Sequence, residues 1–303
     1  MRYSLPALLL VVACGGAPHP TAVPGHHGEA IGVTAAGLPF AIVDGHTGRA
    51  VPTEAFWAAV AGAQAVCVGE EHPNPHHHWA QLQVVEHLAS APGPRALGLE
   101  MIQTPIQGVV DDFVAGTIDE ATFVTRSGWA DRWGYPWALY QPMIAAARGQ
   151  GWTVRALNAP AELVKRVGKV GVAGLEPAER AQLPELVLDD AKHRAWFDAL
   201  MAEMGQHGGE HMPSPDNLYA AQVVWDETMA GTAKAWLDGG GAAIVILAGN
   251  GHCHDWAVAG RLRRRGAAPV VAVRPIIDDG KGGVAAALTE GNVDYLFVMT
   301  MPK

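Results

Sequence analysis

The sequence predicts an α/β protein with a central, largely parallel sheet, helices on both faces of the sheet and a helical lid insertion at about residues 175–215. Two observations lead to this fold class. Short apolar runs typical of buried strands alternate along the chain with segments of helical periodicity. Two of the runs, at 65–68 and 242–248, end in a glycine and polar residues before the next helix begins. In open α/β sheets that position lines the ligand crevice.

The expected elements follow from apolar runs, caps and breakers taken in chain order. Asn74 can cap a helix whose first residue is Pro75, and residues 104–107 have the pattern of a capping box. Asp255 is expected to cap the helix that ends in three arginines before Gly266. We expect strands at 40–43, 65–68, 95–101, 152–157, 242–248, 270–273 and 295–299, and helices at 53–61, 76–91, 104–114, 161–170, 190–204, 216–237 and after 255.

Composition predicts a globular protein and excludes one class of partner. The chain has 303 residues, of which 49% are hydrophobic and 17% charged, so it has ample material for a core. The net charge is −9, and the longest basic run is only residues 263–265. The electrostatic footprint of nucleic-acid binding is therefore missing. We expect one α/β domain over residues 38–303.

The N-terminus has the pattern of a bacterial lipoprotein signal peptide over residues 1–13. An apolar run at 5–13, too short to span a bilayer, leads into a lipobox-like sequence that ends in Cys14. We expect Cys14 to carry lipid and residues 14–37 to form a flexible tether. The protein would then be membrane-anchored in the bacterial cell envelope, in the periplasm or at the outer membrane. An ordinary secretory signal is the alternative.

Two cysteines are left once Cys14 is lipidated. Cys67 and Cys253 each lie beside one of the two glycine-ended strands. An export compartment permits disulfides, so a bridge would form if those two strands were neighbours. The favoured expectation is the other one, a buried free thiol at Cys67.

A G-x-x-H motif follows each of the two strands. Gly69 is followed by Glu70, Glu71 and His72, and Gly249 leads in the same way to His252. Either histidine alone could simply cap a turn. Two such motifs in one chain, each between an apolar strand and a helix, indicate a shared site.

Four side chains lie at strand ends or just past them: Glu70, His72, Glu100 and His252. Two imidazoles and two carboxylates suit a divalent metal centre that activates water, with His72, Glu100 and His252 as the metal ligands. The same four residues suit a metal-free pair in which a histidine is the general base and a glutamate orients it.

Two further segments carry chemistry-bearing side chains. Residues 128–147 are rich in aromatics, which are interpreted as core and lid packing or as the wall of a flat hydrophobic ligand. The glycine-rich loop at 204–212 contains His207, His211 and Met212. Imidazole and thioether groups bind metal or haem, whereas a flexible lid with incidental histidines is the equally weighted alternative.

Taken together, these motifs resemble the ChaN family of bacterial haem-binding lipoproteins, within the superfamily that contains Tiki, TraB and erythromycin esterase. The resemblance covers roughly residues 42–273. It rests on Val68-Gly-Glu-Glu-His72, His76-His77-His78, Gln81, Leu99-Glu100-Met101, the aromatics of 129–140, Asn158-Ala-Pro160, the His/Met loop leading to Gln222-Val-Val-Trp-Asp226-Glu-Thr-Met229, and Ala248-Gly-Asn-Gly-His252.

The resemblance implies a haem-binding lipoprotein tied to haem or iron uptake, with haem or iron as its ligand, the membrane as its anchor and a homodimer left open. Tyrosinate, imidazole and thioether all serve as axial haem ligands, so the candidates are His207, His211, Met212 and Tyr219. The wider superfamily implies the alternative, a metal-dependent hydrolase of the Tiki protease or esterase kind. In that case His72, Glu100 and His252 would be catalytic, with Glu70 as an additional acid.

Overall fold

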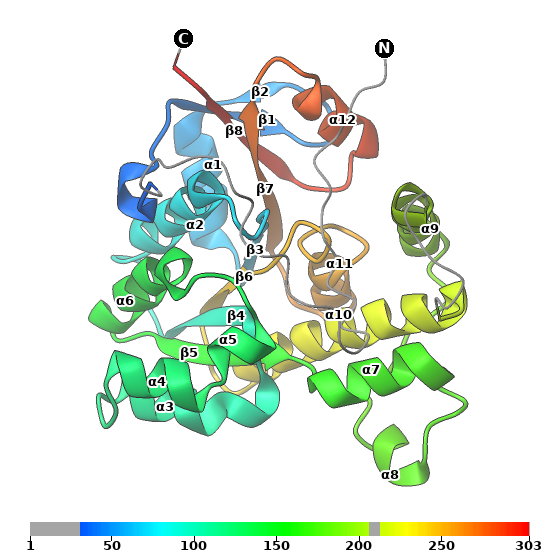
Figure 1. Cartoon of the computed structure of the whole chain (residues 1–303). Coiled ribbons are helices and arrows are strands. Elements are labelled where there is room, and N and C mark those ends of the chain that lie inside the picture. The colour runs from blue at the N-terminus through cyan, green and yellow to red at the C-terminus, as the bar shows by residue number, and fades with distance from the viewer. Residues whose placement is uncertain (1–30, 206–212, 303) are drawn as a thin grey trace.

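The computed structural model describes residues 31–205 and 213–302 (Figure 1). Its centre is an eight-stranded sheet with the order β2-β1-β8-β7-β3-β6-β4-β5. The strands are β1 (Phe40–Asp44), β2 (Ala50–Val51), β3 (Ala65–Val68), β4 (Arg95–Gln103), β5 (Thr153–Asn158), β6 (Ala243–Leu247), β7 (Val270–Asp278) and β8 (Tyr295–Thr300).

The sheet is parallel from β5 to β8 and antiparallel at its other edge. β3 lies between β6 and β7, with Cys67 level with Ile246 on one side and Ala272 on the other. β1 pairs antiparallel with both β8 and β2. The predicted fold class, a largely parallel sheet, is therefore confirmed.

Helices cover both faces of this sheet. They are α1 (Thr53–Gly62), α2 (Pro75–His87), α3 (Gln107–Val114), α4 (Glu120–Arg126), α5 (Trp129–Arg132), α6 (Gln141–Gly149), α7 (Ala161–Val170), α8 (Pro177–Arg180), α9 (Ala191–Gly205), α10 (Pro215–Asp238), α11 (Val258–Arg264) and α12 (Gly283–Glu290), with 3-10 turns η1 (Val33–Ala35), η2 (Thr104–Ile106) and η3 (Trp137–Leu139). Figure 1 shows α1, α2 and α6 on one side of the strands and α10 and α11 on the other.

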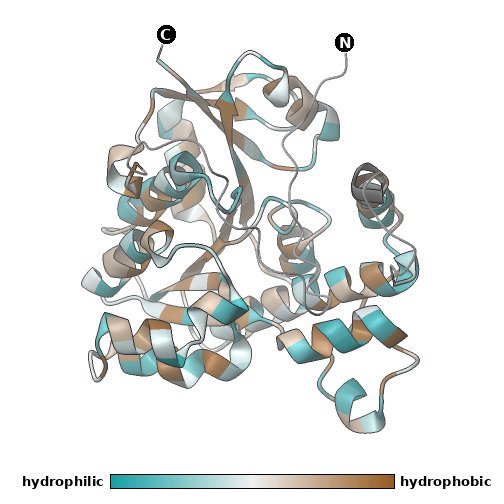
Figure 2. Ribbon diagram, in the orientation of Figure 1, coloured by the Kyte–Doolittle hydropathy of each residue, from teal (hydrophilic) through white to brown (hydrophobic). Residues whose placement is uncertain are grey.

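Strand alternation explains the two layers. In β3, Val66 and Val68 point into the core shared with α1, α2, α3 and α6, whereas Ala65 and Cys67 point into the core shared with α10, α11 and α12. All four β3 residues are buried, as expected for a strand covered on both faces. Figure 2 shows hydrophobic residues running along the central strands and hydrophilic ones on the outer helices.

The segment between α7 and α10 packs on α10. Phe197 of α9 forms a small separate core with Leu218, Tyr219 and Val223 of α10. The predicted helices at 190–204 and 216–237 correspond closely to α9 and α10. In the part of the chain that the structure describes, none of the helices is both long enough and apolar enough to span a bilayer.

The folded part begins ahead of the boundary expected at residue 38. Val33 and Ala36 are buried, and the Ala36 carbonyl lies 2.5 Å from Nδ1 of His76 at the start of α2. The end of the predicted tether therefore belongs to the domain. The glycine and alanine residues of this segment gave no sign that it is buried, because small residues pack closely without forming an amphipathic stripe.

The capping box expected at residues 104–107 does not form. Residues 104–106 make the 3-10 turn η2, and Gln107, the first residue of α3, turns its amide toward β5. Its Nε2 donates to the Val154 carbonyl at 2.9 Å, and its Oε1 accepts from the Ala156 amide at 2.8 Å. A buried backbone pair on a neighbouring strand therefore takes the amide that would have capped the helix locally.

The expectation of a free Cys67 is wrong, because Cys67 and Cys253 form a disulfide. β3 and β6 are neighbours, so the loop after β6 folds back across the end of β3. The bond joins residues 186 positions apart in the sequence and ties that loop, which carries His252, to the central strand.

We predict that the double variant Cys67→Ala, Cys253→Ala loses about 5 kcal/mol of unfolding free energy, because the crosslink restricts a very long loop of the unfolded chain. Denaturant unfolding of the oxidised protein, the reduced protein and the variant would measure this. The reduced protein should resemble the variant, and reductant should not change the variant further. Equal stability of oxidised and reduced wild type would contradict the prediction.

Candidate functional site

An open pocket lies where β3, β4 and β6 end. Its wall combines strand-end polar groups, aromatic rings and the first residue of α7. The lining residues are His72, Glu100, Met101, Gln103, Arg132, Trp133, Tyr135, Asn158, Ala159, Ala161, Gln222, Trp225, Gly249, Asn250, Gly251 and His252. Three of the four predicted strand-end residues thus face one pocket, and Glu70 lies directly behind them.

The two G-x-x-H segments lie side by side. The Asn250 amide donates to the Glu70 carbonyl at 2.9 Å. A Cβ on Gly249 would lie 2.9 Å from Cε1 of His72 and 3.7 Å from Oε2 of Glu100. Glycine is needed at this position because the imidazole and the carboxylate both close in on the backbone there.

His72 is held from behind by Glu70. Its Nδ1 lies 2.8 Å from Oε1 of Glu70, a carboxylate that is completely buried. Gln81 donates to the other oxygen at 2.7 Å, and the Tyr140 hydroxyl donates to Oε1 at 2.7 Å. Because an ionised carboxylate only accepts, Nδ1 of His72 carries the hydrogen, and in the neutral ring the lone pair is on Nε2.

The ionisation of Glu70 and His72 is set by burial and by the neighbouring side chains. Burial opposes ionisation of Glu70, but His78 and His72 outweigh burial, and the pKa of Glu70 is lowered. Burial likewise opposes charge on His72, yet the hydrogen bond and charge of Glu70 prevail, so the pKa of His72 is raised. Glu70 therefore stays ionised and makes the imidazole more basic.

His252 has both ring nitrogens engaged. Its Nδ1 lies 2.6 Å from Oδ1 of Asp226, and its Nε2 lies 3.3 Å from Oε1 of Glu100. The other Glu100 oxygen accepts from the Gly249 amide at 2.6 Å. Burial alone would lower the pKa of His252, but the two carboxylates outweigh it and raise this pKa to about 10. His252 is thus an imidazolium locked between two anions.

Asp226 is a site residue that lies in one of the quoted motifs but to which the sequence assigned no role. It lies on α10, four residues after Gln222, and both side chains reach Nδ1 of His252. Asp226 is fully buried and also faces His193 and Arg261. The available signal was a carboxylate within the mostly apolar run at 218–230, where burial is costly without partners.

The aromatic stretch is divided between the pocket and the core. The rings of Trp133 and Tyr135 line the pocket, with centroids 4.7 Å and 4.9 Å from that of His72. Trp129 and Tyr140 are buried in the core instead. Trp137 packs with Trp129 at 4.9 Å.

The predicted metal set does not close around one point. Within the described ranges, the one group of three whose ligand atoms all lie within 4.8 Å of one another is His46, Asp255 and Asp294. His72, Glu100 and His252 face the same pocket, but their ligand atoms do not all lie within 4.8 Å of one another. Glu100 instead accepts from the Gly249 amide with one oxygen and contacts Nε2 of His252 with the other.

The predicted cofactor ligands are not part of this pocket as described. Tyr219 is 2% exposed and packs against His193 and Phe197, with ring centroids 5.2 Å and 5.4 Å away. His207, His211 and Met212 lie outside the described residues, as does the predicted lipidation site Cys14.

Fold and site together define a doubly covered α/β protein with histidine–carboxylate pairs at the ends of its parallel strands. Residues 56–262 match the family described as "Haem-binding uptake, Tiki superfamily, ChaN", and the chain belongs to this family. No curated protein matches it.

Two solved structures are similar to this chain over different extents. Over 86% of this chain and 96% of the other, the structure is similar to that of ChaN of Campylobacter jejuni with cofacially bound haem, with a TM-score of 0.67 and 17% identity. A mutant of erythromycin esterase EreC in its open conformation matches 74% of this chain and 72% of its own, with a TM-score of 0.45 and 14% identity. At such identity the ChaN match shows the fold.

We predict that His252 contributes pH-dependent stability. Its folded-state pKa of about 10 is above the ordinary 6.5, so the contribution is complete below about pH 6.5 and is lost as pH rises toward 10. The difference in unfolding free energy between wild type and His252→Gln, measured by urea denaturation, should shrink across that range. Trp225→Phe, an uncharged change in the same pocket, is the control. A pH-independent His252 difference would show that the ring is neutral.

Proposed function

We propose that this protein binds haem at the pocket formed by the strand ends and acts in haem or iron uptake. The observation that carries the proposal is His72, whose Nδ1 is anchored by Glu70 and whose Nε2 is left for a ligand on the pocket side. The family to which the chain belongs and the cofacial haem of the similar ChaN structure support the same conclusion.

The donor set fits haem. Neutral imidazole is a common axial ligand, and a carboxylate behind it fixes the tautomer and strengthens the donor. The rings of Trp133, Tyr135 and Trp225 provide flat apolar surface beside it. Arg132, an exposed guanidinium on the same wall, would pair with a propionate carboxylate. Bound haem would supply the iron that the protein carries.

The other axial candidates stay predictions. Tyr219 would have to leave the packed interface under α9 to ligate iron, because the residue is buried there. Among the described residues its hydroxyl has no hydrogen-bond partner. His207, His211 and Met212 would act from the loop that follows α9. A homodimer also stays a prediction.

We further propose that the protein is lipid-anchored in the bacterial cell envelope through Cys14. The lipobox-like sequence supports this, and the Cys67–Cys253 disulfide agrees with an oxidising compartment. In a bacterial host, wild type should partition into detergent with membrane lipoproteins, whereas Cys14→Ser should not. Equal partitioning of the two proteins would rule the anchor out.

The alternative function, a metal-dependent hydrolase, has one observation in its favour. The Glu70–His72 pair has the geometry of a general base with its orienting carboxylate, and Glu100 lines the same pocket. We rank it second because the family is described by haem. The ligand atoms of His72, Glu100 and His252 also do not form one compact group.

We predict that the protein gives a saturable Soret shift with haemin and that His72→Ala weakens haemin binding roughly tenfold or more, because one iron ligand is lost. Absorbance titration would measure this, with elemental analysis of the protein as purified. His87→Ala is the matched control, since His87 is an exposed histidine stacked on Trp57, away from the pocket.

Three other results have distinct meanings. If Tyr219→Phe or the pair His207→Ala, His211→Ala abolishes the shift and His72→Ala does not, haem is bound from α10 and the loop. The pocket is then the wrong site. If the wild type shows no saturable shift, the haem proposal fails. Stoichiometric zinc, manganese or iron that is lost in His72→Ala would then indicate the hydrolase.

A further inference from the structure

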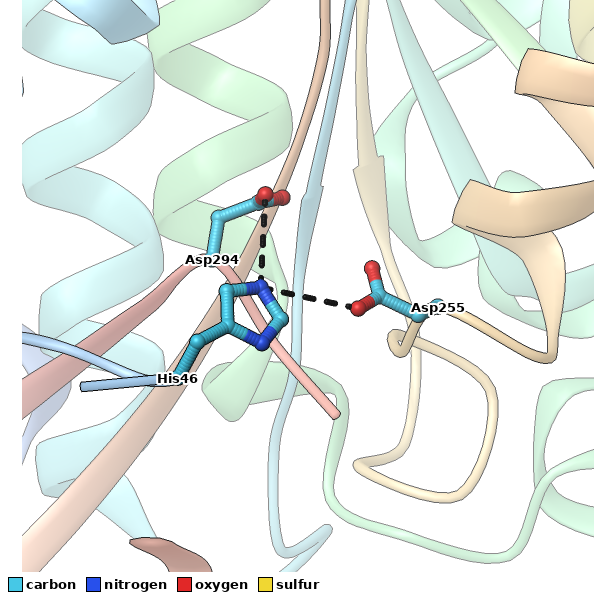
Figure 3. A group of neighbouring side chains, drawn as sticks. All are labelled: His46, Asp255 and Asp294. Atoms are coloured by element: carbon cyan, nitrogen blue, oxygen red, sulfur yellow. Dashed lines mark ion pairs between the residues drawn. The ribbon is translucent and has the colours of Figure 1, made fainter. Parts of the chain in front are cut away.

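A second group of potential ligands lies apart from the pocket, at the antiparallel edge of the sheet. His46 follows β1, Asp255 lies in the loop after β6, and Asp294 directly precedes β8. Figure 3 shows the His46 ring pointing at both carboxylates. Its Nε2 lies 3.6 Å from Oδ2 of Asp255 and 3.9 Å from Oδ1 of Asp294.

One nitrogen of the His46 ring contacts a backbone carbonyl. Its Nδ1 lies 3.0 Å from the Gly291 carbonyl oxygen. Because a carbonyl can only accept, Nδ1 carries the hydrogen, and in the neutral ring the lone pair is on Nε2. That lone pair faces two anionic oxygens, an arrangement that is repulsive unless a cation lies between them.

The outer contacts of the group are those of a supported metal centre. Arg263 donates to Oδ1 of Asp255 and to Oδ2 of Asp294, and the Ala272 amide donates to the latter at 2.7 Å. The two oxygens that face His46 have no hydrogen-bond donor among the described residues. Metal-binding histidines and carboxylates characteristically have their remaining atoms hydrogen-bonded in this way.

The backbone already holds the three segments together. The Asp255 amide donates to the Asn292 carbonyl at 2.8 Å, and the Gly45 amide donates to the Asp294 carbonyl at 3.0 Å. The three side chains therefore start from fixed positions, which lowers the ordering cost of binding an ion.

We propose that His46, Asp255 and Asp294 bind a divalent transition-metal ion of the zinc type, with solvent completing the coordination. Two tetrahedral zinc ligands lie about 3.4 Å apart. The two distances from Nε2 of His46, 3.6 Å and 3.9 Å, are close to this value, and all three ligand atoms lie within 4.8 Å of one another. An imidazole with two carboxylates suits zinc better than the all-oxygen sets of calcium and magnesium.

Charge and exposure agree with this assignment. The two carboxylates and Arg263 leave a net charge of −1, so a dication is attracted and a proton is its competitor. The side chains of His46, Asp255 and Asp294 are 44%, 23% and 29% exposed, which leaves a route for the ion and room for water. The bound ion would join the loop that carries His252 to the antiparallel edge of the sheet.

The test is a zinc titration of the full-length, EDTA-treated protein at neutral pH by calorimetry, with Co²⁺ absorbance as a coordination probe. Because other histidines also take up zinc, the measured quantity is the difference between variants. His46→Ala should lose one equivalent of zinc, or bind it at least tenfold more weakly, and lose the matching Co²⁺ bands. Asp255→Asn should also weaken binding, since the amide oxygen can still accept from Arg263 while a ligand charge is removed.

The controls separate the site from other effects. His87→Ala, the exposed histidine of α2, should keep the wild-type stoichiometry. Zinc should raise the melting temperature of wild type more than that of His46→Ala, and the two should melt alike in EDTA. Identical zinc uptake and Co²⁺ spectra in wild type and His46→Ala would overturn the proposal. So would an NMR spectrum in which His46 holds both ring protons in the presence of zinc, which would leave a proton as the cation.

Discussion

The burial of charged groups at the strand ends is the constraint on which the rest of the structure depends. Glu70 and Asp226 are fully buried and their pKa values are lowered, and buried anions of this kind are tolerated only when nearby groups compensate their charge. The partners come from different elements: Gln81 from α2, Tyr140 before α6 and Arg261 from α11. Satisfying two carboxylates thus fixes helices on both faces of the sheet.

The two histidines that look equivalent in sequence have different roles because of these carboxylates. His72 has one carboxylate, on Nδ1, which leaves the other nitrogen for a ligand. His252 lies between Glu100 and Asp226 and is held as a cation with both nitrogens engaged. The first G-x-x-H motif therefore provides a histidine nitrogen that can bind a ligand. The second provides a fixed positive charge that keeps Glu100 ionised in the same pocket.

The loop after β6 is secured at several points. Cys253 binds it covalently to β3, the Asn250 amide bonds to the first motif, and Asp255 bonds to Arg263. The residue between these anchors, His252, is the one whose position the pocket needs. A metal ion at His46 would add a further connection from the edge of the sheet, independent of haem.

Local sequence determined much of this protein: the alternation of buried strands and helices, the Asn74 cap of α2, and the polar residues that end β3, β4 and β6. These depend on periodicity and on neighbours in the chain. Only the tertiary structure decided what depends on strand order. Because β3 lies beside β6, Cys67 meets Cys253, and because α10 crosses beneath that loop, Asp226 reaches His252. Gln107 likewise bonds to β5 and does not form the predicted capping box. The backbone groups it meets belong to a strand that is distant in sequence and adjacent in the fold.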